Sequence, residues 1–148
     1  MALSIVKELL REYVQSLFNE GIVNDQFSQI QTLKSKEQPD CVVRLINMYF
    51  IDVETILSKL RSYSELPDVD YSRLAVLARE IQEKSSRIGA EHVRRACNNL
   101  IQACDRMHKQ NFILALDWIK NEFCHTRNKL ESFVQTERKI IRLESKSD

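Results

Sequence analysis

The stretch LAVLAREIQEKSSRIGA, from Leu74 to Ala90, decides how the rest of the chain is interpreted. At about 100° per residue, its apolar side chains fall on one side of a helix and its polar side chains on the other. The apolar members are Leu74, Leu77, Ala78, Ile81 and Ile88. The polar members are Arg79, Gln82, Glu83 and Ser86. The stretch therefore predicts an amphipathic helix with one buried face and one face offered to solvent or to a partner.

Length and composition favour a single all-helical domain. The chain has 148 residues, of which 43% are hydrophobic and 29% are charged, as in an ordinary soluble globular protein. That length is enough for one substantial core. Only two glycines and two prolines occur, so the tight hairpin turns that a sheet needs are scarce. We expect one α-helical domain over residues 1–148.

Apolar residues at intervals of three and four predict five more helices. They run from Ser4 to about Asn19, from Asn24 or Asp25 through Leu33, from Pro39 through Leu60, from Glu91 to about His108, and from Asn111 to about Glu137. Short connections favour antiparallel neighbours. We therefore expect six helices, the last four forming an up-down four-helix bundle with the two N-terminal helices packed on one end.

Local signals place the helix ends. Gly21 and Gly89 are suited to left-handed C-terminal caps, and Asp70 is suited to cap the N-terminus of the central helix. Asn111 is expected to cap the last helix. Beyond Glu137 the apolar spacing decays, so we expect residues 138–148 to form a frayed, solvated end.

Charge and spacing argue against several function classes. The net charge is +1 and no basic stripe is interleaved with aromatic residues, so nucleic acid is not an expected ligand. No apolar run reaches the roughly 18 residues of a membrane span, and the N-terminal residues read as amphipathic helix rather than as a targeting signal. The four cysteines are widely spaced without a C-x-x-C pair, so we expect reduced thiols.

Catalytic and metal sites are also poorly supported. Cys97, Cys104 and His108 lie near one helical face, but a metal site needs closer, convergent ligands, and buried cysteine is the favoured interpretation. No glycine-rich loop or nucleophile elbow is present. We expect no cofactor, no metal and no enzymatic activity, and we expect Trp118 to lie in the core.

Three segments, in order along the chain, carry a distinctive pattern: GIVNDQFSQIQTL from Gly21, YFID from Tyr49 and SSRIGAEHVRR from Ser85. Together they resemble the plant histidine-containing phosphotransfer proteins. GIVNDQFSQIQTL, from Gly21 to Leu33, is similar to the family run G-I-(L/V)-(D/N)-x-Q-F-x-Q-(L/I)-Q-x-L. Tyr49-Phe50-Ile51-Asp52, with Leu57, resembles the family segment YFxDsexLL, and SSRIGAEHVRR resembles a serine run leading into Ile-Gly-Ala and a basic helix start. The resemblance covers roughly residues 5 to 135.

The resemblance also shows departures at the reactive position. Counting back without gaps from Ile88-Gly89-Ala90, the phosphorylated histidine of the family falls on Arg79, its lysine on Gln82 and its glycine on Glu83. A guanidinium stays protonated and has no acceptor lone pair, so it cannot accept phosphate as an imidazole does. The resemblance therefore implies a pseudo member that inhibits cytokinin-type two-component signalling in the cytoplasm and nucleus. Arg79 and Glu83 stand four residues apart and are expected to pair weakly.

The implied partners are the receiver domains of hybrid histidine kinases and of response regulators, bound by a monomer. The first two helices and the exposed side of the fourth should make the contacts. The candidate residues are Leu17, Ile22, Val23, Phe27, Gln31, Arg79, Gln82, Glu83 and Ser86.

Two alternatives remain open at this stage. One is an all-helical scaffold that kept the fold and binds unrelated proteins. The other is a working carrier that uses His92, His108 or His125. None of the three histidines has the family's flanking residues, so surface or capping roles are favoured for them.

Overall fold

The computed structural model describes residues 2–146 and confirms the all-α prediction, with six helices and no strand among these residues. The helices are α1 (Ala2–Asn19), α2 (Asp25–Gln31), α3 (Cys41–Ser64), α4 (Tyr71–Ile88), α5 (Glu91–Asp105) and α6 (Lys109–Lys146). None of them is both long enough and apolar enough to cross a membrane.

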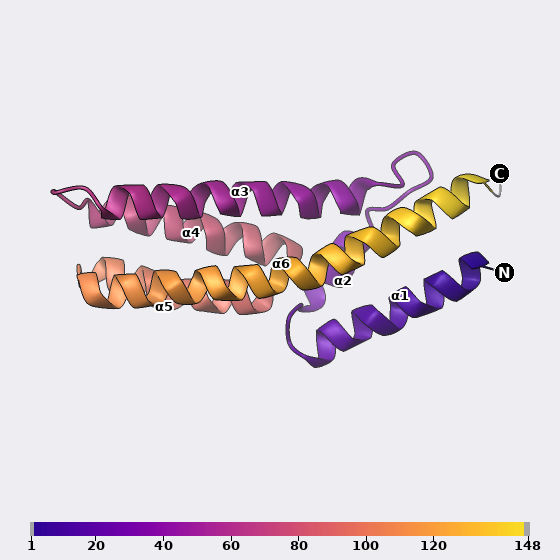
Figure 1. The fold of residues 1–148 in the computed structure, drawn as a ribbon, viewed down its shortest axis with the longest axis horizontal. Helices are drawn as coiled ribbons and strands as arrows, with labels where there is room; N and C mark the ends of the chain where they lie inside the picture. The colour runs from indigo at the N-terminus through magenta and orange to yellow at the C-terminus, as the bar shows by residue number, and fades with distance from the viewer. Residues whose placement is uncertain (1, 147–148) are drawn as a thin grey trace.

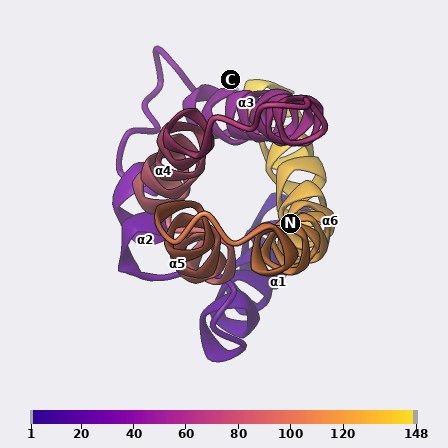
Figure 2. The ribbon, with the colours of Figure 1, turned by 90° about the vertical axis from the view of Figure 1, so that its left-hand side faces the viewer.

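Helices α3 to α6 form the predicted up-down bundle (Figure 1). Viewed from one end they make a ring, with α3 and α6 on one side and α4 and α5 on the other (Figure 2). The short helix α2 lies outside the ring on the α4–α5 side, and α1 runs along the C-terminal half of α6. The Tyr13 hydroxyl ties α1 to α6 by donating to the Lys129 carbonyl oxygen at 2.8 Å.

Most of the core is made by the apolar stripes that the helical spacing predicts. Leu33 is an exception, because α2 ends at Gln31 and the Leu33 side chain is exposed. On α4, Leu74, Ala78 and Ile81 are fully buried. Two edge-to-face ring pairs connect the elements: Phe27 on Phe133, with centroids 5.2 Å apart, and Tyr49 on Phe123, at 6.0 Å. Burying one such large apolar side chain contributes about 1.5–3 kcal/mol, so the stripes supply most of the driving force for folding.

Most of the predicted caps are present. The Asp70 carboxylate accepts from the Arg73 amide at 3.2 Å, and the Asn24 side chain accepts from the Gln26 amide at 3.0 Å at the start of α2. Gly21 and Gly89 have φ angles of 73° and 82°, in the left-handed region where glycine is favoured. These caps stop α1 and α4 at the predicted residues.

Two predictions about α6 were wrong. The helix begins at Lys109, and the residue that caps it is His108, whose Nδ1 accepts from the Asn111 amide at 3.1 Å. Residues 138–146 are not frayed, because the helix continues to Lys146 and Ile140 is only 3% exposed. Helix α1 packs along this part of α6 and lies beside Ile140. Residues 147 and 148 lie outside the described residues.

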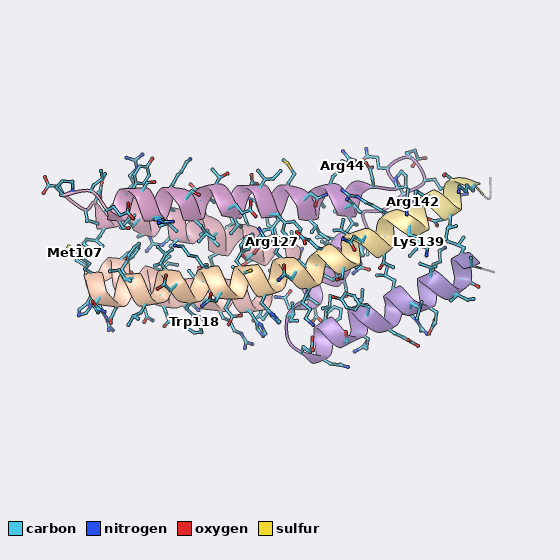
Figure 3. All side chains as sticks on the ribbon, viewed as in Figure 1. Arg44, Met107, Trp118, Arg127, Lys139 and Arg142 are labelled. Atoms are coloured by element: carbon cyan, nitrogen blue, oxygen red, sulfur yellow. The ribbon has the colours of Figure 1, made fainter. Side chains whose placement is uncertain are left out.

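Trp118 is a further correction. Its side chain is 45% exposed, on the surface of α6, rather than in the core (Figure 3). Its indole N–H donates to Glu122 one turn later, at 3.2 Å. The core positions of this part of α6 are taken by Ala115, Leu116 and Ile119 instead.

Candidate partner-binding site

Arg79 projects from the middle of α4 toward α5. Its Nη2 atom lies 3.6 Å from Oδ1 of Asp105, and both side chains are more than half exposed, at 55% and 57%. The predicted pairing of Arg79 with Glu83 is absent; the Glu83 carboxylate instead accepts from Arg87 at 2.5 Å. A glutamate four residues before an arginine is the favourable order on a helix. An exposed pair of this kind is worth less than about 1 kcal/mol, so the Arg79 guanidinium is available to a partner.

Gln82 is fixed in the seam between α4 and α5. Its Nε2 donates to Oδ1 of Asn98 at 2.7 Å and to the Arg94 carbonyl oxygen at 3.2 Å. Ser86 is exposed one turn later, and its hydroxyl donates to the Gln82 carbonyl oxygen at 2.9 Å. The structure therefore brings the four α4 candidates together on one helix face, as the sequence predicted.

The four apolar candidates from the first two helices are placed differently. Leu17, Ile22, Val23 and Phe27 are all buried, Phe27 completely, so they are core residues and not a ready contact surface. The reason is that α2 packs on the bundle, with the Phe27 ring against Phe133. An apolar stripe on a short helix looks the same in sequence whether it faces the core or a partner.

A groove next to these buried residues is exposed instead. It runs between α1, α2 and α6, and the half-buried Gln31 is the one predicted residue that lines it. Val14 and Phe18 supply apolar lining, and Lys34 is paired there with Glu137. We call it the α1–α2 groove. Val14 and Phe18 could not be recognised as surface residues in the sequence, because both fit the helical spacing that identifies core positions.

Helix α2 is anchored to the α4–α5 turn by Glu91, a residue that no sequence pattern singled out. The Glu91 carboxylate accepts from Asn24 Nδ2 at 2.6 Å, from Arg94 Nη2 at 2.5 Å and from Arg95 Nε at 2.8 Å. The bond from Arg94, with those from Asn24 and Arg95, lowers the pKa of Glu91 from 4.5 to about 2, although burial opposes the shift. The only signal in the sequence was an acid in the first turn of a helix.

Replacing Glu91 by glutamine should destabilise the fold at neutral pH. The loss of charge-assisted bonds is expected to lower the free energy of unfolding by about 1–2 kcal/mol at pH 7. Because the folded-state pKa is depressed, this contribution is complete above pH 4.5 and disappears as the pH falls toward 2. Urea unfolding across this pH range measures it. The matched control is Glu83→Gln, an exposed acid whose loss should cost at most about 0.5 kcal/mol.

Among the described residues, no group of histidine, cysteine and acidic side chains is placed to hold a metal. Burial raises the pKa of Cys97 to about 12 and that of Cys104 to about 11, so these thiols stay protonated. His92 lies 3.6 Å from Glu122, His108 caps α6, and His125 is exposed on α6.

The chain is similar over almost its full length to plant phosphotransfer proteins. It is 30% identical over 132 residues to histidine-containing phosphotransfer protein 1 of Arabidopsis thaliana, covering 89% of this chain and 86% of the relative. It is 29% identical over 140 residues to histidine-containing phosphotransfer protein 1 of Oryza sativa, covering 95% of both. Pseudo histidine-containing phosphotransfer protein 6 of Arabidopsis thaliana is 27% identical over 133 residues, with 89% and 86% covered.

The fold comparison agrees with the sequence comparison. The crystal structure of a histidine-containing phosphotransfer protein from maize superposes with a TM-score of 0.84 at 29% identity, covering 91% of this chain and 99% of the maize chain. A scan against protein-family models finds no match. The length of the shared sequence and the shared bundle together decide the assignment: the chain belongs to the histidine-containing phosphotransfer proteins of two-component signalling.

Proposed function

We propose that this chain is a pseudo member of its family, which binds receiver domains without accepting phosphate and so acts as a negative regulator of the phosphorelay. The observation that carries the proposal is the exposed guanidinium of Arg79, at the position where the family resemblance puts the phosphorylated histidine. The pseudo proteins of rice and Arabidopsis among its relatives support it.

The chemistry at position 79 argues against phosphate transfer. A phosphate-accepting histidine needs a ring nitrogen with a free lone pair, and the guanidinium of Arg79 has none. At the family's lysine position, the Gln82 amide carries no charge and its donors are used by Asn98 and the Arg94 carbonyl oxygen. Glu83 adds a negative charge where a phosphoryl group would arrive. Each of the three changes removes a condition for transfer.

The same residues leave binding possible. Receiver domains of hybrid histidine kinases and response regulators hold clustered aspartates, and Arg79 can exchange its long, exposed pairing with Asp105 for such a carboxylate at little cost. The α1–α2 groove, with Val14 and Phe18, would supply the apolar part of the contact. A monomer occupying a receiver in this way keeps active carriers off it, in the cytoplasm and nucleus where cytokinin-type signals pass.

A phosphotransfer assay tests the chemistry. The chain is incubated with a receiver domain that carries labelled aspartyl phosphate, and a histidine-containing relative serves as positive control. We expect label on the relative and none on this chain, while a pull-down recovers the receiver with the chain. Label on the chain would overturn the proposal, and replacing His92, His108 and His125 would then show whether one of them carries phosphate. Binding only to proteins other than receivers would favour the scaffold alternative.

Replacing Arg79 by alanine should weaken receiver binding by about tenfold, because a charged contact near the centre of an interface is lost. Titration calorimetry with the receiver measures the effect. Arg73→Ala is the matched control, since Arg73 lies on the same helix but stacks over the Tyr63 ring, toward α3. An equal loss for both variants would contradict the proposed role of Arg79. Phe27→Ala is unsuitable as a test because it opens a cavity in the core.

A further inference from the structure

The C-terminal part of α6 separates its charges onto two faces. Arg138, Lys139, Arg142 and Lys146 are all exposed and, at about 100° per residue, fall within an arc of about 100° on the helix. Among the described residues, none of these four cations forms an ion pair within 4.0 Å. We call them the α6 basic stripe.

The acids of this part of α6 are turned inward and already paired. Glu137 is buried and contacts Lys34 Nζ at 2.5 Å. Glu144 lies 3.2 Å from the same Lys34 ammonium and 3.3 Å from Lys7. The charges of these two glutamates are compensated by Lys7 on α1 and by Lys34, which follows α2. The α6 basic stripe therefore faces solvent without a counterion from its own helix.

An apolar surface lies beside the stripe. A groove between α1 and α6 is lined by Val6, Leu9, Tyr13, Thr136 and Lys139, so one cation of the stripe belongs to both features. Ile5 and Leu9, one turn apart on α1, are 60% and 57% exposed. Aliphatic side chains this exposed, next to unpaired cations, are typical of a contact surface.

This surface faces away from the α4–α5 seam that holds Arg79. Lys139 and Arg142 lie on α6 toward the viewer in Figure 3. In the end-on view α3 and α6 form one side of the ring, and α4, α5 and α2 lie on the other (Figure 2). A receiver docked on Arg79 would therefore leave the α6 basic stripe uncovered.

We propose that the α6 basic stripe and the α1–α6 groove together bind an acidic, amphipathic segment of another protein. Its carboxylates would pair with Arg138, Lys139 and Arg142, and its aliphatic side chains would pack on Leu9 and Ile5. A protein segment fits better than a membrane surface because the apolar lining is a groove between two helices, which suits a peptide rather than a flat bilayer.

The test uses the full chain and a fluorescent peptide with glutamate and leucine at helical spacing. We expect anisotropy to show salt-dependent binding that falls by about tenfold or more when Arg138, Lys139 and Arg142 are changed to glutamate. Changing the same three residues to glutamine should give a smaller loss of affinity, because this variant removes the positive charges without introducing negative ones near the helix end. The matched control changes Lys59, Arg106 and Lys109, three exposed cations away from the stripe, to glutamate and should bind normally. Circular dichroism shows whether each variant is folded.

A separate experiment tests the apolar half of the surface. Ile5→Ser with Leu9→Ser should weaken binding without reducing its salt dependence, and a scrambled peptide of the same composition should bind poorly. Equal loss in the control variant, equal binding of the scrambled peptide, or sedimentation with phosphatidylserine vesicles in place of peptide binding would overturn the proposal. Arg79→Ala should leave peptide binding unchanged, so the result stands apart from receiver binding.

Discussion

The triple variant Arg79→His, Gln82→Lys, Glu83→Gly is expected to take label from a phosphorylated receiver, whereas the natural chain takes none. Position 79 is exposed in the middle of α4, so an imidazole there has a free ring nitrogen facing solvent. Lysine at 82 supplies positive charge for the phosphoryl group, and glycine at 83 removes the carboxylate that would repel it. The measurement is gel autoradiography after incubation with labelled receiver.

The scaffold should tolerate these three changes. All three positions lie off the buried face of α4, which Leu74, Ala78 and Ile81 form. Glycine inside a helix costs about 1 kcal/mol relative to alanine, and losing the Glu83–Arg87 pair adds a few tenths. Losing the Gln82 hydrogen bonds to Asn98 and Arg94 adds about 1 kcal/mol. Arg79→His alone should take little label, because the negative charge of Glu83 remains. If the folded triple variant binds receiver and still takes no label, the missing imidazole is not what blocks transfer.

Much of the fold could be predicted because the deciding signals are local. The buried face of α4 follows from the spacing of Leu74, Ala78 and Ile81, and its two ends from Asp70 and Gly89. The exposed side of the same helix was predicted for the same reason, since polar residues at helical spacing must face away from the core. Arg79, Gln82 and Ser86 were therefore placed correctly without any knowledge of their neighbours.

What the sequence could not show depends on contacts between distant segments. Phe27 is core because Phe133 lies on it, and Ile140 is buried because α1 covers the end of α6. Arg79 pairs with Asp105 at the end of α5 and not with a residue on the next turn of α4. Glu91 is an anchor only because α2 brings Asn24 to it. Helical spacing ranks residues by face, but it does not say which element arrives at that face.

The junction at Gly89 gives the second large expected effect: Gly89→Ala should destabilise the protein by about 3 kcal/mol or more. A Cβ atom here would lie 2.5 Å from the Phe27 backbone nitrogen and 2.8 Å from Asn24 Oδ1. Backbone cannot yield as a flexible side chain can, so α2 must move away and lose the bond from the Asn24 amide to the Gly89 carbonyl oxygen, now 3.0 Å. The left-handed φ of 82° adds strain.

Gly21 provides the control that separates strain from collision. Its φ of 73° is similar, but a Cβ there would meet only His92 Nε2 at an ordinary 3.5 Å, so Gly21→Ala should cost about 1 kcal/mol. Asparagine tolerates left-handed backbone, so Gly21→Asn should be nearly neutral, whereas Gly89→Asn should stay costly because its Cβ meets the same backbone. Urea unfolding gives the four values, and hydrogen exchange of the α2 amides shows whether that helix detaches. An equal loss of unfolding free energy for the two alanine variants would mean that α2 does not pack against Gly89. The position of α2 relative to Arg79 would then not be fixed by this contact.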